Sequence, residues 1–451
     1  MLRSFAIKFV ANNLVVAIDF ARPPLLANDQ SGNNLLGNKP VGRMAVHKLP
    51  GEVGNWVAGE RFWGREKEIV RLLELLADGA NVSIIAQRRI GKTSLMREAG
   101  NRLPPEYLAL HVDLQHAKDA ADMVVKLALA TQLHAGPWAK TRTVFANILQ
   151  TVRDSIESIS AYELEIQLRA GLSGGTWQEK GGQMLSELAK AGRPVVLFVD
   201  ELPILVNRML ENPDSGKAAV HTLLTWLRGQ ALAHAGHIRM VFAGSIGLEP
   251  VLARAGLTAD INHLTPFLLD PWPTPVALDC LLALAAYRGI DLPDTAARRM
   301  LELLGCNIPH HVQLFFAHVR EHCLYAERTA CEPAAIDEIF HQRMLGTKGH
   351  AELSHMVERL EMVLEKAELP LAMELLTQTA ITGSLGRQAI ETLCARNGLA
   401  REDMGRRLPR LFEIFEHDGY LDKNQAGEYV FVSNLLRQWW LARFEAFFVT
   451  V

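Results

Sequence analysis

The 451-residue sequence has few cysteines, no long apolar run and no excess of charge of either sign. Its five cysteines are odd in number and form no Cys-x-x-Cys pair. This excludes an ordinary disulfide framework and a four-thiolate zinc site, and it favours a reducing, cytoplasmic location. No apolar stretch approaches the roughly 20 residues of a membrane-spanning helix. The 47 Lys and Arg residues are nearly balanced by 50 Asp and Glu residues. Any surface that attracts nucleic acid must therefore be a local patch of positive charge.

The N-terminal segment lacks a clear pattern. Its first 20 residues place a basic residue before an apolar stretch in signal-like order, but Lys8 and Asp19 interrupt that stretch. Residues 28–43 are rich in Gly and Asn and have no periodicity. We expect residues 1–43 to form a poorly structured extension, and whether they belong to the mature protein stays open.

Alternating apolar runs and amphipathic helices begin near residue 60, a pattern typical of an α/β protein. The strand-like runs are residues 81–86, 107–114, 194–200 and 238–244. They are apolar on both faces, which indicates a parallel sheet covered by helices on both sides. The helices are expected at residues 92–101, 119–134, 142–170, 178–191 and 217–235. Past residue 270 the pattern becomes helical, and "GYLDKNQAGEYVFVS" near the end predicts a hairpin.

The strongest motif is "AQRRIGKTS", which lies between a predicted strand and a predicted helix, as a P-loop does. Its residues are Ala86, Gln87, Arg88, Arg89, Ile90, Gly91, Lys92, Thr93 and Ser94. Ala86 stands where the general pattern has its first glycine. The backbone amides of such a loop bind phosphates at a helix N-terminus. Lys92 is expected to reach the β- and γ-phosphates of ATP, and the Thr93 hydroxyl to bind Mg²⁺.

A second motif, "VVLFVDEL", ends an apolar strand in two carboxylates. Asp200 is expected to hold Mg²⁺, and Glu201 to polarise the water that attacks the γ-phosphate. Together with the P-loop, this motif is typical of ATPases with an additional strand between the two motifs. The candidate for that strand is "YLALHVDL", residues 107–114.

Ser245 follows the next apolar strand, in "VFAGSIG". A small polar side chain at this position would lie beside the γ-phosphate and sense it. The alternative is that Ser245 caps the helix that follows.

Four segments in this order, "RFWGREKEIVRLLELL", "AQRRIGKTSL", "VVLFVDELPIL" and "FAGSIG", resemble the P-loop ATPases of the AAA+/STAND type. The likeness is closest to the archaeal-type ATPase family, whose P-loop carries the same Arg-Arg pair. It implies that Phe62, Gly64 and Arg65 lie near the adenine and ribose. Without the resemblance, this aromatic-Gly-Arg stretch would be read as a helix start.

The resemblance also implies the domain order. It gives a three-layer P-loop core over residues 44–270, an all-α lid over 271–350 and a winged-helix domain over 351–451. In the lid, "GCNIPHHVQLF" resembles a segment whose proline packs on adenine, which implies that Pro309 touches the nucleotide. Pro309 is equally well placed as a first-turn residue of a helix.

The expected recognition helix of the winged helix carries Arg406, Arg407 and Arg410, a spacing that could meet a DNA backbone. Acidic neighbours dilute this charge, and winged helices also serve as packing modules that regulate an ATPase. Members of the family often use an arginine from a neighbouring subunit. The candidates, which the sequence does not rank, are Arg88, Arg89, Arg239 and Arg254.

Two motifs point elsewhere and are set aside. His318 to His322 spells the H-x-x-E-H of some zinc peptidases, but no third ligand is recognisable and two polar histidines on a helix suffice. Residues 172–175 spell the "LSGG" of transporter ATPases, yet the flanking residues and the P-loop differ from that class. This stretch is better interpreted as a Gly-Ser turn.

The sequence therefore predicts an ATP hydrolase that uses ATP and Mg²⁺ and closes its lid on its core. Its output is open between action on nucleic acid and a signalling switch that contacts a protein partner, with slow or no turnover. A homo-oligomer is compatible with either output, and no membrane partner is expected.

Overall fold

The computed structural model describes residues 7–11, 14–18, 48–51, 54–145, 161–172, 175–190 and 192–451. The chain divides into two compact units, Met1–Val46 and His47–Val451. In the first unit, β1 (Ile7–Ala11) and β2 (Leu14–Ile18) pair antiparallel, with Ile7 opposite Ile18. This hairpin differs from the unstructured extension expected for residues 1–43, because β-branched runs on both sides of an Asn-Asn pair are themselves a hairpin signal. The rest of that extension lies outside the described residues.

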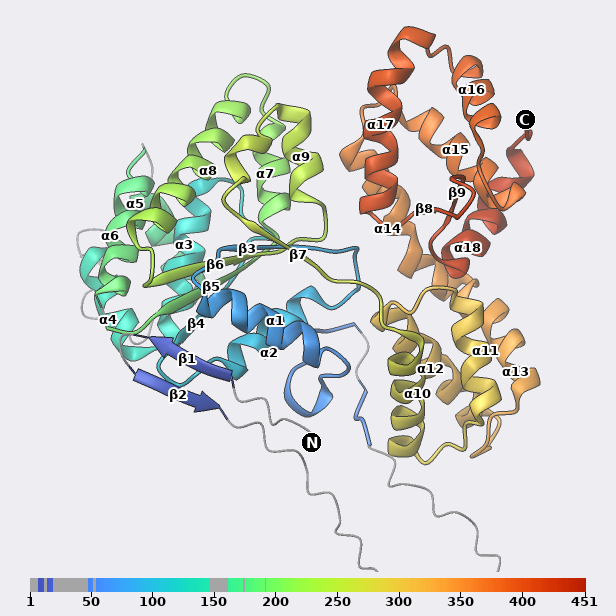
Figure 1. Ribbon diagram of the computed structural model, residues 1–451, viewed down its shortest axis with the longest axis horizontal. Helices are drawn as coiled ribbons and strands as arrows, with labels where there is room; N and C mark the ends of the chain where they lie inside the picture. Colours follow the sequence, from blue (N-terminus) through green and yellow to red (C-terminus); the bar gives the residue numbers. More distant parts are fainter. Residues whose placement is uncertain are drawn as a thin grey trace, which may run out of the picture. The chain divides into compact units, whose positions relative to one another are not determined.

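The second unit contains the predicted parallel sheet (Figure 1). Its strands are β3 (Val82–Ile85), β4 (Leu108–Asp113), β5 (Val195–Asp200), β6 (Ile238–Phe242) and β7 (Thr265–Leu268). They lie in the order β4-β5-β6-β3-β7 and are all parallel. The strand between those of the two motifs is therefore β6. The expectation that residues 107–114 fill this place is wrong, since β4 lies beyond β5 at the sheet edge.

Strand β7 was not anticipated from the sequence. It has only four residues, and one of them is Pro266, which cannot donate a backbone hydrogen bond. Such a residue is tolerated because β7 is an edge strand that pairs only with β3. A short proline-containing run is too weak a pattern to be distinguished from a loop.

Successive buried residues of β5 join different apolar clusters, which assigns the helices to the two faces of the sheet. Val196 and Phe198 pack with α1 (Glu66–Ala77) and α2 (Lys92–Arg102). Val195, Leu197 and Val199 join the larger cluster on the opposite face. Among the helices that the core contributes to that cluster are α3 (Ala120–Ala130), α5 (Ala161–Gly171), α6 (Trp177–Ala189), α7 (Leu202–Leu210), α8 (Gly216–Ala233) and α9 (Leu248–Ala255). The core is thus the predicted three-layer arrangement.

Two helices of the core differ from expectation. The predicted helix over residues 142–170 is represented by α4 (Ala135–Val144) and α5, and residues 146–160 lie outside the described part of the chain. Helix α7 begins directly after Glu201, with Pro203 in its first turn. This helix is not among those expected from the sequence.

The lid consists of α10 (Thr274–Arg288), α11 (Asp294–Leu304), α12 (Pro309–Tyr325), α13 (Pro333–Ile339) and the π-helical turn η5 (Phe340–Met344). Helix α14 (Thr347–Val363) follows and spans the expected domain boundary at residue 350. The winged helix has α15 (Leu369–Thr382), α16 (Arg387–Arg396), α17 (Arg401–His417), β8 (Leu421–Lys423), β9 (Tyr429–Phe431) and α18 (Asn434–Phe444). A bridge from Leu385 to Tyr429 adds the third strand position of its wing. Among the helices that the structure describes, none is long and apolar enough to cross a membrane.

A half-buried histidine on β4 generates a prediction about stability. The His111 ring stacks on Phe198 at 4.8 Å between centroids, and burial together with Arg97 lowers its pKa from 6.5 to about 4. Between pH 6.5 and pH 4, His111 is therefore protonated in the unfolded chain but stays neutral in the folded chain. The free energy of unfolding should fall by about 2 kcal/mol from this group alone between pH 7 and about pH 5.

We expect His111→Leu to lose less stability over this pH range than the native protein, measured as the urea concentration at the midpoint of unfolding. The exposed His116 on the same segment provides the control, and His116→Leu should follow the native protein. Equal acid sensitivity of native and His111→Leu proteins would show that His111 is not the responsible group.

Candidate nucleotide site

The P-loop turns from β3 into α2 through two residues with left-handed backbone. These are Arg89, with φ +66°, and Gly91, with φ +99°. Such a conformation costs about 1–2 kcal/mol for a residue with a side chain, so it is held by the surrounding structure. Gly91 precedes α2, and no side chain caps the helix. Its first backbone N–H groups are thus available to an anion, as the sequence predicted for a phosphate-binding loop.

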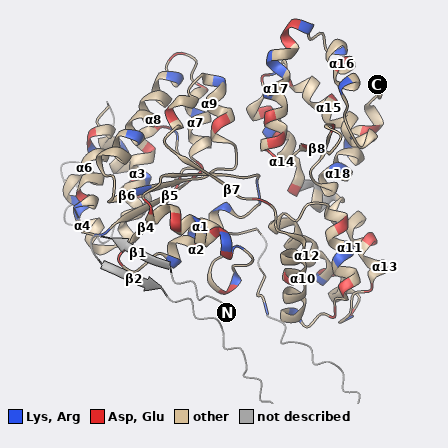
Figure 2. Cartoon of the chain, in the orientation of Figure 1, with Lys and Arg blue, Asp and Glu red and all other residues tan. Residues whose placement is uncertain are grey.

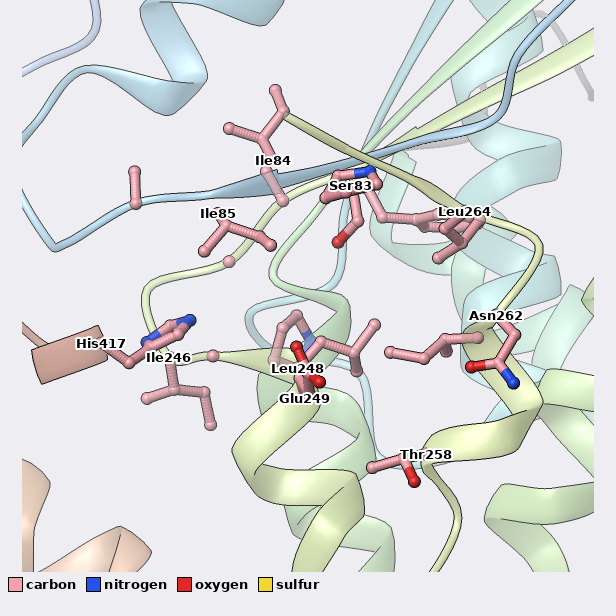
Figure 3. A pocket seen from close by; sticks show the side chains of 18 residues that line it. Ser83, Ile84, Ile85, Ile246, Leu248, Glu249, Thr258, Asn262, Leu264 and His417 are labelled. Carbon is pink, nitrogen blue, oxygen red and sulfur yellow. The ribbon is translucent and has the colours of Figure 1, made fainter. Parts of the chain in front are cut away.

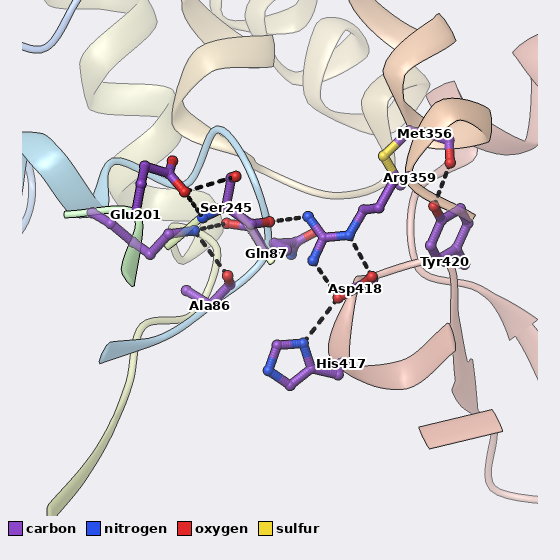
Figure 4. Close-up of polar contacts among 10 residues, drawn as sticks. Ala86, Gln87, Glu201, Ser245, Met356, Arg359, His417, Asp418 and Tyr420 are labelled. Atoms are coloured by element: carbon purple, nitrogen blue, oxygen red, sulfur yellow. Dashed lines mark hydrogen bonds and ion pairs between the residues drawn. The ribbon is translucent and has the colours of Figure 1, made fainter. Parts of the chain in front are cut away.

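Lys92 lies across this loop. Its ammonium donates hydrogen bonds to the carbonyl oxygens of Ala86 at 2.9 Å and Gln87 at 2.8 Å (Figure 4). Burial, together with the charge of Arg359, lowers the pKa of Lys92 to about 8, although Glu201 and Asp200 favour its charged form. The side chain is therefore a desolvated cation, and an added anion would stabilise its charge.

Thr93 and Asp200 meet at the start of α2 and the end of β5. The Thr93 hydroxyl donates to a carboxylate oxygen of Asp200 at 2.5 Å. Burial raises the pKa of Asp200, and the bond from Thr93 and the charge of Lys92 oppose this shift. A hydroxyl beside a carboxylate is a suitable pair of oxygen ligands for Mg²⁺. The two residues predicted to bind the metal are thus brought together from positions 107 residues apart.

Glu201 follows Asp200 in a left-handed backbone conformation, with φ +62°. One of its carboxylate oxygens accepts hydrogen bonds from the Ser245 backbone N–H at 2.8 Å and from the Ser245 hydroxyl at 2.9 Å (Figure 4). Burial raises the pKa of Glu201, and the bonds from Ser245 oppose this. The alternative role of Ser245 as a helix cap is wrong, because Gly247 precedes α9 as its N-cap.

These residues border a cavity of about 620 Å³. Six cations line it: Arg61, Arg65, Arg88, Arg89, Lys92 and Arg359. The acidic residues in the same lining number three: Asp200, Glu201 and Glu358. Four aromatic side chains also contribute: Trp56, Phe62, Trp63 and Trp272. An excess of positive charge beside aromatic surface suits a ligand that carries several phosphates and a base.

The residues carried over from the family resemblance differ in position. Phe62 and Pro309 line the cavity. Arg65 also lines it, but its buried guanidinium donates to the Ile90 carbonyl at 3.3 Å and so supports the P-loop. Gly64 lies against the lid, where an added Cβ would come within 2.4 Å of Val276. With φ +68°, this position requires glycine both for its backbone and for the close approach.

Sequence reasoning missed the contribution of α14. Glu352, His355 and Arg359 recur at helical spacing and face the P-loop. Glu352 pairs with Arg89 at 3.1 Å and contacts His310 at 3.1 Å. A polar stripe on a helix is the only signal in the sequence, and it is the same as that of an ordinary solvent-exposed face.

The four arginines considered as candidates for completing a neighbouring subunit's site have different surroundings in the structure. The Arg239 side chain is buried and donates to the Leu76 carbonyl at 2.6 Å, so it cannot reach another subunit. Arg254 donates to Asn207 at 2.6 Å and to the Val363 carbonyl at 3.1 Å. Arg88 and Arg89 line the cavity of their own chain.

A second cavity of about 270 Å³ lies beside the carboxyl ends of β3 and β6, with His417 at one side (Figure 3). Apolar side chains such as Ile85, Ile246 and Leu264 dominate its wall, and Glu249 is its only acidic or basic group apart from His417. Without a lysine or arginine, this smaller cavity does not suit a triphosphate.

None of the described residues of the two motifs set aside above lines the nucleotide cavity. His318 is buried on α12, and its ring lies 3.6 Å from Glu321. Over the described ranges, no group of three His, Cys, Asp or Glu residues is placed to hold a metal ion. Leu172 belongs to the apolar core, while Ser173 and Gly174 lie outside the described residues.

Comparisons with known proteins show what this sequence and fold are similar to. No protein-family model matches the chain. An uncharacterized ATP-binding protein of Pyrococcus abyssi is 22% identical over 235 residues, which are 48% of this chain and 62% of that protein. The chain thus spans less than two thirds of the length of this curated relative.

Two solved structures share the fold. A Walker-type ATPase of Pyrococcus abyssi has a TM-score of 0.58 and 15% identity, over 86% of this chain and 99% of that chain. The Orc2 protein of Aeropyrum pernix, solved with ADPNP and ADP, has a TM-score of 0.50 and 12% identity, over 84% and 93%. The expected likeness is confirmed: the chain has the fold of the archaeal P-loop ATPases and is similar in sequence to an archaeal ATP-binding protein.

Proposed function

We propose that this chain is a Mg²⁺-dependent ATP hydrolase that works as a conformational switch. The observation that carries the proposal is the convergence of Lys92, the Thr93–Asp200 pair and the Glu201–Ser245 pair on one cavity with excess positive charge. The similarity to an archaeal ATP-binding protein supports the same conclusion.

In this proposal, Lys92 leaves the carbonyls of its own loop and binds the β- and γ-phosphates. The free amides at the start of α2 hold the same phosphates. Thr93 and Asp200 would bind Mg²⁺, which when present offsets the charge that develops on the phosphate oxygens. Phe62 and Pro309 lie in the cavity wall where the adenine would pack.

Glu201 orients the attacking water, and Ser245 senses the γ-phosphate. Because Ser245 donates both its hydrogen bonds to one oxygen of Glu201, the two residues must rearrange together when a phosphate enters. Loss of these bonds changes the loop after β6, so the presence of the γ-phosphate is communicated beyond the site. This coupling supports a switch in addition to simple hydrolysis.

The output of the switch is better supported as a protein partner than as DNA. Arg406 pairs with Asp403 at 3.0 Å, and Arg410 lies 3.9 Å from Glu368. Both signs of charge occur along α17 (Figure 2). Its exposed charged residues are Arg401, Glu402, Arg406, Glu413 and Glu416. Such a helix lacks the concentrated positive charge that binds a duplex backbone.

The first test is ATP turnover by native, Lys92→Ala and Glu201→Gln proteins. We expect Lys92→Ala to lose phosphate binding and Glu201→Gln to keep ATP binding but lose turnover by about 100-fold or more, because general base catalysis is removed. Turnover is measured as released phosphate, and ATP affinity by calorimetry. Equal, negligible turnover by native and Glu201→Gln proteins would exclude hydrolysis and leave a nucleotide-binding switch.

The second test concerns nucleic acid. We expect added duplex DNA to leave the ATP turnover of the native protein unchanged. We also expect the native protein to bind DNA no more tightly than the Arg406→Ala/Arg407→Ala protein does. Binding should be followed over a range of salt concentrations, since phosphate contacts weaken steeply with salt. DNA-stimulated turnover that these two substitutions abolish would instead establish the nucleic-acid output.

A further inference from the structure

Arg359 connects three parts of the second unit. It lies on α14, and its guanidinium donates hydrogen bonds both to the Asp418 carboxylate and to the backbone carbonyl of Ser245 (Figure 4). The Arg359 side chain is only 5% exposed and that of Asp418 4%. Asp418 follows α17 in the winged helix, whereas Ser245 belongs to the core. One arginine therefore joins the winged helix to the residue that holds Glu201.

The neighbours of Asp418 complete the contact between the winged helix and the core. The His417 ring contacts the Asp418 carboxylate at 3.0 Å and packs on Gly247, where an added Cβ would be 2.3 Å away. Gly419, with φ +77°, packs on the P-loop residue Gln87, and an added Cβ would lie 2.3 Å from that side chain. Tyr420 donates to the Met356 carbonyl on α14 at 2.5 Å. This turn thus touches both loops that shape the nucleotide site.

The charges of the pair depend on each other. Burial disfavours the charge of Arg359, but Asp418 outweighs this effect and raises the arginine pKa. Burial also acts against the Asp418 charge, and Arg359 outweighs it and lowers the pKa of that carboxyl. A buried ion pair is stable only while both partners are present. If the winged helix leaves, Arg359 loses its counter-ion and the two bonds that orient its guanidinium, so the contact with Ser245 is no longer held in place.

The carbonyl of Ser245 is the point where this affects chemistry. While Arg359 binds that carbonyl, the loop after β6 keeps the Ser245 N–H and hydroxyl directed at one oxygen of Glu201. The oxygen that accepts both bonds has no lone pair left for a water molecule, and the same two bonds fix the direction in which the second oxygen points. The docked arrangement therefore keeps the hydrolytic carboxylate in a resting state.

We propose that Arg359 is a positioning residue through which the docked winged helix restrains Glu201, so that undocking of the winged helix raises ATP turnover. This inference rests on the proposed hydrolysis of ATP. It assigns to the Arg359–Asp418 pair a regulatory role, and to the winged helix the role of the element that a partner displaces.

The central experiment compares native and Asp418→Asn proteins. We expect Asp418→Asn to raise kcat at least threefold with less than a twofold change in KM, because the substitution weakens the hold on Glu201 without altering the phosphate contacts. Glu374→Gln is the matched control, since it breaks the Arg396–Glu374 pair at 3.0 Å inside the winged helix, away from the site. It should leave kcat at the native value.

Cys306 reports on docking independently of turnover. It is 8% exposed, and Leu304 and Gly305 beside it contact Ser433 and Asn434 of the winged helix. Undocking should therefore accelerate its reaction with a thiol reagent. Asp418→Asn is expected to label faster than native protein, with the extra signal absent when Cys306→Ala is added.

Arg359→Lys separates the relay from docking. A lysine keeps the ion pair with Asp418 but lacks the guanidinium fork that also reaches Ser245. We expect raised kcat with native labelling of Cys306, and no further rise when Asp418→Asn is combined with it. This variant retains both charges and so keeps the test valid if Asp418→Asn folds poorly.

The outcomes distinguish failure of the regulatory role of Arg359 from failure of the proposed ATP hydrolysis. If native protein hydrolyses ATP and neither Asp418→Asn nor Arg359→Lys raises kcat, the regulatory inference is overturned and the hydrolase remains. If native and both variants hydrolyse no more ATP than Glu201→Gln, the proposed hydrolysis fails, and the inference fails with it.

Discussion

The nucleotide site depends on keeping opposite charges together in a place where water is largely excluded. Lys92, Asp200 and Glu201 are each shifted by burial toward their neutral forms. The two carboxylates favour the charge of Lys92, and Lys92 favours theirs, whereas Asp200 disfavours the charge of Glu201. A single buried charge of this kind would be very unfavourable, but a matched set is tolerable. The sheet provides the match, because parallel strands end at the same edge and bring residues of distant sequence together.

The same requirement extends the site beyond the core. The cations that line the cavity outnumber its carboxylates. Two of them are balanced from outside the cavity: Arg89 by Glu352 of α14, and Arg359 by Asp418 of the winged helix. Binding of a triphosphate would add negative charge in the middle of this arrangement. It would change which cations still need their protein partners, which links the nucleotide to the position of the other domains.

Much of the core could be predicted from the sequence. The order of strands and helices, the P-loop and the acidic pair are local patterns, and the contact of Thr93 with Asp200 follows once both motifs are placed at one sheet edge. The sequence predicts residues 107–114, which form β4, as the strand between β3 and β5, but β6 lies there instead. The order of strands along the chain does not give their order in the sheet. Strand β7 was missed because Pro266 and its short length hide an edge strand.

The residues that join the domains could not be predicted in the same way. Arg359 contacts Asp418 across 59 residues and Ser245 across 114, and neither contact leaves a periodic or spaced pattern in the sequence. Gly64 and Gly419 are likewise explained only by what lies against them in the fold. Tertiary pairing of this kind is fixed by packing and charge, which a single sequence does not display.

The composition of the domain contact bears on how firmly it closes. Apart from apolar packing, the winged helix meets the nucleotide loops through a buried ion pair, a histidine ring and a glycine turn. A buried ion pair contributes little net stability, because the desolvation of its two charges offsets most of their attraction. It nevertheless requires one specific geometry, since a small displacement leaves both charges unpaired. Such a contact is specific without being strongly held, which is the property that a switch between docked and undocked states requires.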